Sequence, residues 1–190
     1  GAKTARTDYA ARGFVYHHNS DIWGLSNPVG DSGRGTATYA FWPMSAGWLS
    51  AHAFEHYRFS QDQACLRDTA YPILRDAARF YLNVLTEDTD QTLIFAPSTS
   101  PENMFRIDSG ASGVSKTTTM TTAIIRETLR NTAACCSILG IDDRLQAEAE
   151  EALRRLPDYK TGSLGELLEW SEEMPEAEPL HRHTSHLYPL

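Results

Sequence analysis

The sequence has few cysteines and no zinc-binding spacing. Its 190 residues include three cysteines, Cys65, Cys135 and Cys136, and no Cys-x-x-Cys or cysteine–histidine pattern typical of a zinc site occurs. Cys135 and Cys136 are adjacent in a helical pattern and point to different faces, so a disulfide between them would be strained. We therefore expect three free, partly buried thiols, which leave the redox compartment open.

Positive charge and long apolar runs are also scarce. With 17 Lys and Arg against 25 Asp and Glu, the formal net charge is −8. Nucleic acids and anionic membranes are bound by basic surfaces, so neither is expected as a partner. No apolar run approaches the roughly 18 residues of a membrane span, and the N-terminus lacks the apolar core of a signal peptide. A neutral small molecule or a sugar remains a compatible ligand.

What the composition does contain is typical of a globular domain. The hydrophobic fraction is 41% and the charged fraction 22%, as in ordinary folded proteins, and the length suits one domain. There is no initiator Met, and the last residues follow directly on a dense histidine cluster. We expect residues 1–190 to be a single partial domain, cut from a longer protein at both ends.

Apolar residues recur at steps of three and four, which predicts an all-α protein. The first two predicted helices are 3–12 and 43–59. The next follows the capping residues Ser60 and Asp62, has its apolar stripe over 70–85 and is divided by Pro72 near Tyr71. The last two are 117–139 (ended by Gly140) and 142–156 (capped by Asp142 or Asp143). Long polar and aromatic loops join them at 14–38, 96–116 and 158–190, and 92–95 is a short extended run. Because bundles usually have short connections, these loops favour a barrel of paired helices with the loops forming a cleft.

Three loop segments are dense in polar and aromatic groups, and loops on a rigid scaffold commonly carry binding and catalytic residues. They are His17-His-Asn-Ser-Asp-Ile-Trp-Gly24, Pro97-Ser-Thr-Ser-Pro-Glu-Asn103 and His181-Arg-His-Thr-Ser-His-Leu-Tyr188.

Glu102 is the strongest candidate for a proton donor. Glycoside hydrolysis needs a carboxylic acid that stays protonated near neutral pH, and apolar or aromatic walls raise the pKa of a carboxyl. Glu102 follows Pro101 and precedes Asn103, Met104 and Phe105. From the local sequence alone, a solvated or capping loop glutamate is the commoner interpretation.

The two flanking segments also allow alternatives. Asp21 with Trp23 suits either sugar binding or an Asx-turn beside a half-buried tryptophan. His181, His183 and His186 lack the His-x-x-x-His spacing of a helical zinc site, so a metal centre is the least favoured interpretation. Sugar contacts by Arg182 and His183, or a hydrogen-bonded turn, are favoured over it.

Five motifs in order carry a resemblance that covers nearly the whole chain. They are the three segments above together with Phe41-Trp-Pro-Met44 and Glu55-His-Tyr-Arg-Phe59. In this combination the chain closely resembles glycoside hydrolase family 95, the α-L-fucosidases acting on α-1,2-linked fucose, with some α-L-galactosidases.

The resemblance implies part of an (α/α)6 barrel and an inverting hydrolase that needs no metal or cofactor. It implies Glu102 as the general acid and these substrate-binding residues: His18, Asn19, Asp21, Trp23, Trp42, Asn103, Arg182 and His183. It also implies an Asn-x-Asn element and an Ile-Asp-Gly-Asn segment that handle the attacking water. We expect the Asn-x-Asn element before residue 1 and the Ile-Asp-Gly-Asn segment after residue 190. Ile107-Asp108-Ser-Gly110 is only a superficial echo of the second. We therefore expect the 190 residues alone to be inactive.

The expected ligand is a fucosylated oligosaccharide or polysaccharide, with the rest of the barrel as the missing partner. Two other classes remain open: a carbohydrate-binding helical module without hydrolysis, and another (α/α)6 sugar enzyme such as an α-L-galactosidase, epimerase or lyase. Secretion is expected by analogy with the family alone.

Overall fold

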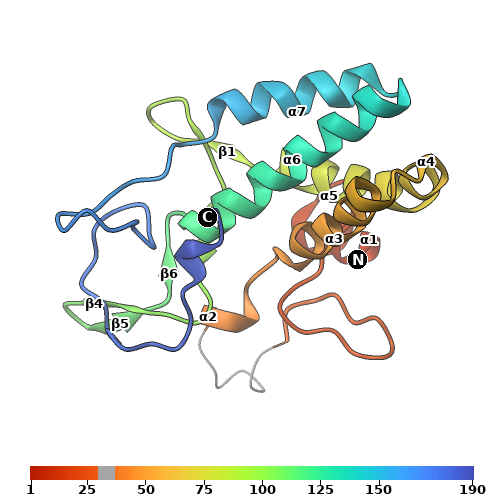
Figure 1. Ribbon diagram of the computed structural model, residues 1–190. Coiled ribbons are helices and arrows are strands. Elements are labelled where there is room, and N and C mark those ends of the chain that lie inside the picture. Colours follow the sequence, from red (N-terminus) through yellow and green to blue (C-terminus); the bar gives the residue numbers. More distant parts are fainter. Residues whose placement is uncertain (30–36) are drawn as a thin grey trace.

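The computed structural model describes residues 1–29 and 37–190, and helices dominate this part of the chain (Figure 1). The longer helices are α1 (Ala2–Tyr9), α3 (Ser45–Ser60), α5 (Tyr71–Val84), α6 (Thr119–Leu139) and α7 (Asp143–Arg155). Shorter helical segments are α2 (Ala37–Ala40), α4 (Gln63–Cys65), a π-helical turn at Leu66–Ala70 and a 3-10 turn at Ser185–Leu187. The predicted all-α class is confirmed, and the predicted barrel stays a prediction.

Local sequence signals set most helix ends where they were predicted. Asp62 caps α4 by accepting from two backbone N–H groups, and Asp142 caps α7. Gly140 ends α6 in the left-handed conformation with φ 63°, which glycine adopts without steric cost. The division near Tyr71 is confirmed, because the π-helical turn ends directly before α5, whose second residue, Pro72, has no N–H to donate.

Two predicted boundaries need correction. Helix α1 ends at Tyr9 rather than Arg12, because Ala10 takes the left-handed conformation with φ 52°. The predicted loop over 14–38 holds for 14–29. Residues 30–36 lie outside the described residues, and α2 begins at Ala37.

Helix α6 is central to the core and packs against α3, α5 and α7. The buried side chains between them include Met44, Phe80, Tyr81, Ile124, Leu129, Leu66, Leu74, Cys135 and Cys136. Gly47 permits this packing, since a Cβ there would lie 2.5 Å from Oη of Tyr81 and 2.8 Å from Cγ2 of Ile124. The cysteines are free, as predicted. Burial raises the pKa of the Cys135 thiol to about 12.

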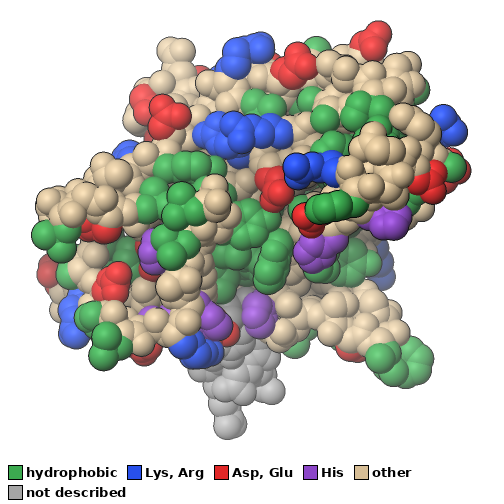
Figure 2. Space-filling model, viewed as in Figure 1, with side chains coloured by type: hydrophobic (Ala, Val, Ile, Leu, Met, Phe, Trp, Pro, Cys, Tyr) green, Lys and Arg blue, Asp and Glu red, His purple; other side chains and the backbone are tan. Residues whose placement is uncertain are grey.

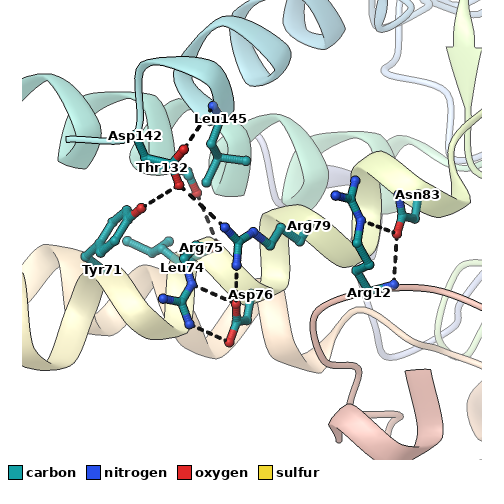
Figure 3. Close-up of polar contacts among 10 residues, drawn as sticks. All are labelled: Arg12, Tyr71, Leu74, Arg75, Asp76, Arg79, Asn83, Thr132, Asp142 and Leu145. Carbon is teal, nitrogen blue, oxygen red and sulfur yellow. Dashed lines mark hydrogen bonds and ion pairs between the residues drawn. The ribbon is translucent and has the colours of Figure 1, made fainter. Parts of the chain in front are cut away.

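Polar contacts reinforce the packing at the start of α7 (Figure 3). Oδ2 of Asp142 accepts a hydrogen bond from Oη of Tyr71 at 3.0 Å and lies 3.5 Å from Nη2 of Arg79. At the other end of α5, the backbone N–H of Arg12 donates to Oδ1 of Asn83 at 2.8 Å. Helix α5 is therefore tied both to the N-terminal segment and to the α6–α7 corner.

The predicted loop over 96–116 is wrong in part, because it contains four short strands. They are β3 (Ser98–Thr99) paired with β6 (Val114–Ser115), and β4 (Phe105–Ile107) paired with β5 (Gly110–Ser112), both antiparallel. Another antiparallel pair, β1 (Thr86–Glu87) with β2 (Leu93–Ile94), matches the predicted extended run. Strands of two or three residues are too short to show an alternating pattern in sequence.

The strands β3 to β6 and the segment 157–190 gather at the end of the molecule where α6 begins and α7 finishes (Figure 1). Within the described ranges, every helix is too short or too polar to cross a membrane.

Candidate active site

The loop that carries Glu102 runs from β3 to β4 and is fastened to the start of α6. Oγ of Ser98 lies 2.8 Å from Oγ1 of Thr121 in the first turn of the helix. The backbone N–H of Asn103 donates to the carbonyl of Ser100 at 2.9 Å, which closes a tight turn around Glu102. Glu102 thus projects from a constrained turn on the edge of the helical core.

Glu169 holds this turn from both sides. Its Oε1 accepts from the hydroxyl of Ser100 at 2.6 Å and its Oε2 accepts from Nδ2 of Asn103 at 2.8 Å. The carbonyl of Glu169 also accepts from the backbone N–H of Thr119 at 3.0 Å. Glu169 is only 5% exposed. Its carboxylate therefore fixes the residues before and after Glu102 relative to α6.

Glu169 is not among the predicted site residues, because it lies in the predicted loop over 158–190. One signal was available: Glu169 follows two leucines and precedes Trp170, and a carboxylate within an apolar run is seldom buried without a partner. The same contacts occupy Asn103, whose Oδ1 also accepts from the backbone of Met104 at 2.8 Å. Asn103 is thus engaged in holding the turn.

Two predicted site residues reach Glu102 from the end of the chain. The Arg182 guanidinium donates a hydrogen bond to Oε2 of Glu102, and Nε2 of His183 lies 3.4 Å from the same oxygen. The hydroxyl of Ser185 donates to the carbonyl of Pro101. Side chains separated by about 80 residues in the sequence are therefore brought together. Figure 2 shows histidines at the surface beside acidic and basic groups.

The segment 181–188 is also anchored to α6. Oη of Tyr188 donates to Oε2 of Glu127 on α6 at 2.6 Å, and burial together with this bond raises the pKa of Tyr188. Nδ1 of His186 turns toward Glu169, at 3.8 Å from Oε2. The three histidines considered as a metal trio therefore do not gather. A different group does, since His181, His183 and Glu102 offer ligand atoms within 4.8 Å of one another.

The comparison with protein families decides what kind of protein carries this site. The description "Glycosyl hydrolase family 95 catalytic domain" matches residues 1–190, the whole chain. The chain belongs to glycosyl hydrolase family 95.

Relatives with assigned names agree with this family. The chain is 39% identical over 192 residues to "Alpha-L-fucosidase 2" of Arabidopsis thaliana, covering 100% of this chain and 22% of that protein. It is 30% identical over 194 residues to "Probable alpha-fucosidase A" of Aspergillus niger, covering 99% of this chain and 23% of that protein. This family 95 chain thus spans less than a quarter of the length of either relative.

The first polar segment of the family 95 chain lies apart from Glu102. The loop bearing His18, Asn19, Asp21 and Trp23 projects away from β4 and β5 (Figure 1). Oδ1 of Asp21 accepts from the backbone of Trp23 at 2.9 Å and of Leu25 at 3.1 Å. The Asx-turn is therefore present, and the sugar contact of Asp21 and Trp23 stays a prediction. Trp23 is 83% exposed rather than half-buried.

Trp42 lies inside the core rather than at the surface. It is 3% exposed and packs edge-on against Trp48, with ring centroids 5.7 Å apart. This geometry favours a packing role, because an aromatic ring must present an open face to stack on a sugar. The sugar contact of Trp42 stays a prediction.

Proposed function

We propose that this chain supplies the acid side of the active site of an α-L-fucosidase, built on part of an (α/α)6 barrel. The observation that carries the proposal is the convergence of Arg182 and His183 on the carboxylate of Glu102. The names of the two relatives point to α-linked fucose as the sugar. We propose, from the resemblance to the family, that the substrate is an oligosaccharide or polysaccharide with a terminal α-1,2-linked fucose. In this proposal residues 1–190 form one part of the catalytic domain.

Glu102 acts as the general acid in the proposed reaction. Its proton passes to the glycosidic oxygen as the bond to the fucose C1 breaks, and water attacks C1 from the opposite face, inverting the anomeric configuration. Arg182 donates to Oε2 of Glu102 in the structure, and its side chain is 69% exposed. In the proposed cycle Arg182 leaves this oxygen while Glu102 carries the proton, and it returns to the carboxylate that proton transfer leaves behind. In this proposal His183, 3.4 Å from Oε2 of Glu102, hydrogen-bonds the sugar or the leaving group. Groups that activate the water lie, in this proposal, in another part of the protein.

The supporting residues act by holding Glu102 in place. Proton transfer requires the donor within hydrogen-bond reach of the glycosidic oxygen, about 2.6–3.2 Å. The bonds from Ser100 and Asn103 to Glu169 limit movement of the turn that carries the acid. Such support is what a general acid needs, because small displacements of a catalytic group cost activity.

The direct test is Glu102→Gln in the protein at its natural length, with Asp108→Asn as the matched control. Asp108 is an exposed carboxylate in the nearby β4–β5 turn. We expect Glu102→Gln to lower kcat on a natural fucosyl disaccharide by about 10²–10⁴-fold, and to lower it far less on a dinitrophenyl fucoside, whose leaving group needs little protonation. Equal losses on both substrates would reject the acid role, whereas Asp108→Asn should change neither.

Product analysis separates the alternatives. Release of β-L-fucose from an α-L-fucoside, observed by NMR before mutarotation, is expected for the inverting hydrolase. Fucose binding without turnover indicates a carbohydrate-binding module instead. Preferential release of L-galactose, or an epimerised or unsaturated product, indicates another sugar enzyme.

A further inference from the structure

Glu102 also belongs to a group of metal-ligating side chains that its proposed acid role does not require. Glu102, His181 and His183 each offer one ligand atom, and these atoms lie within 4.8 Å of one another. Two imidazole nitrogens and one carboxylate oxygen are a common ligand set for zinc and neighbouring divalent transition metals. The two histidines come from one segment and the carboxylate from another, so their proximity is a tertiary feature.

His181 supplies independent support for a ligand at this position. Its side chain is only 6% exposed, and its Nδ1 lies 3.0 Å from Oε2 of Glu178. Because a carboxylate oxygen accepts, the ring proton sits on Nδ1 and the lone pair on Nε2. That Nε2 atom is buried without a hydrogen-bond partner among the described residues. A carboxylate on one nitrogen with the other left open is how metal-binding histidines are usually oriented.

The spacing of the other two ligand atoms suits a tetrahedral ion. Bonds of about 2.0–2.1 Å to zinc place neighbouring ligand atoms about 3.4 Å apart. Nε2 of His183 lies 3.4 Å from Oε2 of Glu102. This pair already has the separation that zinc needs, and a water molecule would complete the coordination.

We propose that Glu102, His181 and His183 bind a divalent transition metal, best matched by zinc, and that the bound ion inhibits hydrolysis. The inhibition rests on the proposed acid role of Glu102, because a carboxylate held by a metal cannot carry the transferred proton. The binding itself does not rest on that role. Arg182 competes with the ion, since its guanidinium donates to the same Oε2; with a 69% exposed side chain, it is free to turn away.

The test uses the protein at its natural length, freed of metal by a chelator and titrated with zinc chloride in a calorimeter, with fucoside hydrolysis assayed in parallel. We expect Glu178→Gln, which removes only the carboxylate behind His181, to weaken zinc binding about 10–100-fold. His181→Gln should weaken it at least as much. Arg182→Ala should tighten it, because the competing cation is gone.

A matched control addresses zinc bound elsewhere on the surface. His52 and His56 are both exposed on α3 and four residues apart, a spacing that can hold a metal ion. His52→Gln should leave the zinc affinity of the Glu102 group unchanged. No zinc binding, or binding that Glu178→Gln and His181→Gln leave unaltered, overturns the site. Binding that both variants weaken, without any inhibition, keeps the metal site and removes Glu102 as the acid.

Discussion

Asn103 donates a hydrogen bond from Nδ2 to Oε2 of Glu169 at 2.8 Å, and both side chains are at least 95% buried. The bond joins two segments that are 66 residues apart. Since Ser100 donates to the other carboxylate oxygen, Glu169 holds the turn by hydrogen bonds at two points. Glu102 lies between these two points, so the hydrogen bonds of Glu169 help to fix its position.

The first prediction follows from these two hydrogen bonds to Glu169. Glu169→Gln keeps the size of the side chain but replaces one acceptor with an amide N–H₂, which faces donors. We expect a loss of about 1–3 kcal/mol in stability, from a buried polar group left badly paired, and a fall in kcat on a natural fucoside of about tenfold or more. Measurements are thermal unfolding and steady-state kinetics.

The readout that identifies a positioning role is the leaving group. Glu169→Gln should reduce turnover of a natural fucoside more than that of a dinitrophenyl fucoside, because only the former needs the acid in place. Glu172→Gln, at an exposed glutamate three residues away, is the control and should change neither property. A purely structural role predicts equal losses on both substrates.

How far the sequence predicts this site depends on the range of each contact. Gly140 and Asp142 act on their own helix ends, so local rules place Gly140 and narrow the cap of α7 to Asp142 or Asp143. The convergence of Arg182 on Glu102 spans 80 residues, and only the resemblance to a family put the two in one site. Glu169 had neither a local rule nor a motif, because its partners, Ser100 and Asn103, are distant in sequence.

The same limit explains why neither the short strands nor the burial of Trp42 is predicted. The strands β3 to β6 satisfy backbone groups by pairing across the loop, which two- or three-residue segments do not reveal. Trp42 stands in a motif shared with the family, but its burial depends on Trp48 and the surrounding core. A motif indicates that a residue is important, but only the tertiary packing shows whether its side chain is open to a substrate or buried in the core.

A second prediction concerns Gly47, where α3 approaches α5 and α6. Gly47→Ala adds a Cβ that would lie 2.5 Å from Oη of Tyr81 and 2.7 Å from Oγ1 of Thr128. Overpacking of this kind costs about 1–3 kcal/mol, more than the helix propensity that alanine gains. We expect a lower unfolding temperature. Ala51→Gly, one turn further along α3, is the propensity control, and an unchanged Gly47→Ala protein would contradict the close approach.

A third prediction concerns Asp142, which caps α7 and bonds to Tyr71 and Arg79. Asp142→Ala removes the cap, worth about 1 kcal/mol, and places alanine at φ 51°. Asp142→Asn should lose less, because asparagine caps helices and tolerates the left-handed conformation. Denaturant unfolding of both variants measures the difference. Asp143→Ala, at the exposed next residue, should cost little. Equal losses for Asp142→Ala and Asp143→Ala would argue against the cap.

The last prediction is a pH dependence that His17 adds to stability. His17 is buried, its Nδ1 lies 2.6 Å from the carbonyl of Ser26, and its Nε2 lies 2.5 Å from Oη of Tyr9. Since the carbonyl only accepts, Nδ1 carries the proton and Tyr9 donates to Nε2, which describes a neutral ring. Burial lowers the pKa of His17 below its ordinary value near 6.5.

The sign follows from proton linkage. Below about pH 6.5 the unfolded chain binds a proton at this histidine before the native protein does, so stability falls as the pH drops toward the lowered pKa of His17. The effect is at most about 1.4 kcal/mol per pH unit. His17→Asn keeps a donor for Ser26 and cannot titrate. We expect it to be less stable at pH 7.5 yet to lose less stability than the parent protein between pH 7.5 and 5.5. The free energy of unfolding of both proteins is measured with denaturant at the two pH values. An equal loss of stability in both would show that His17 does not take up the proton on unfolding, because the two proteins share all other titrating groups.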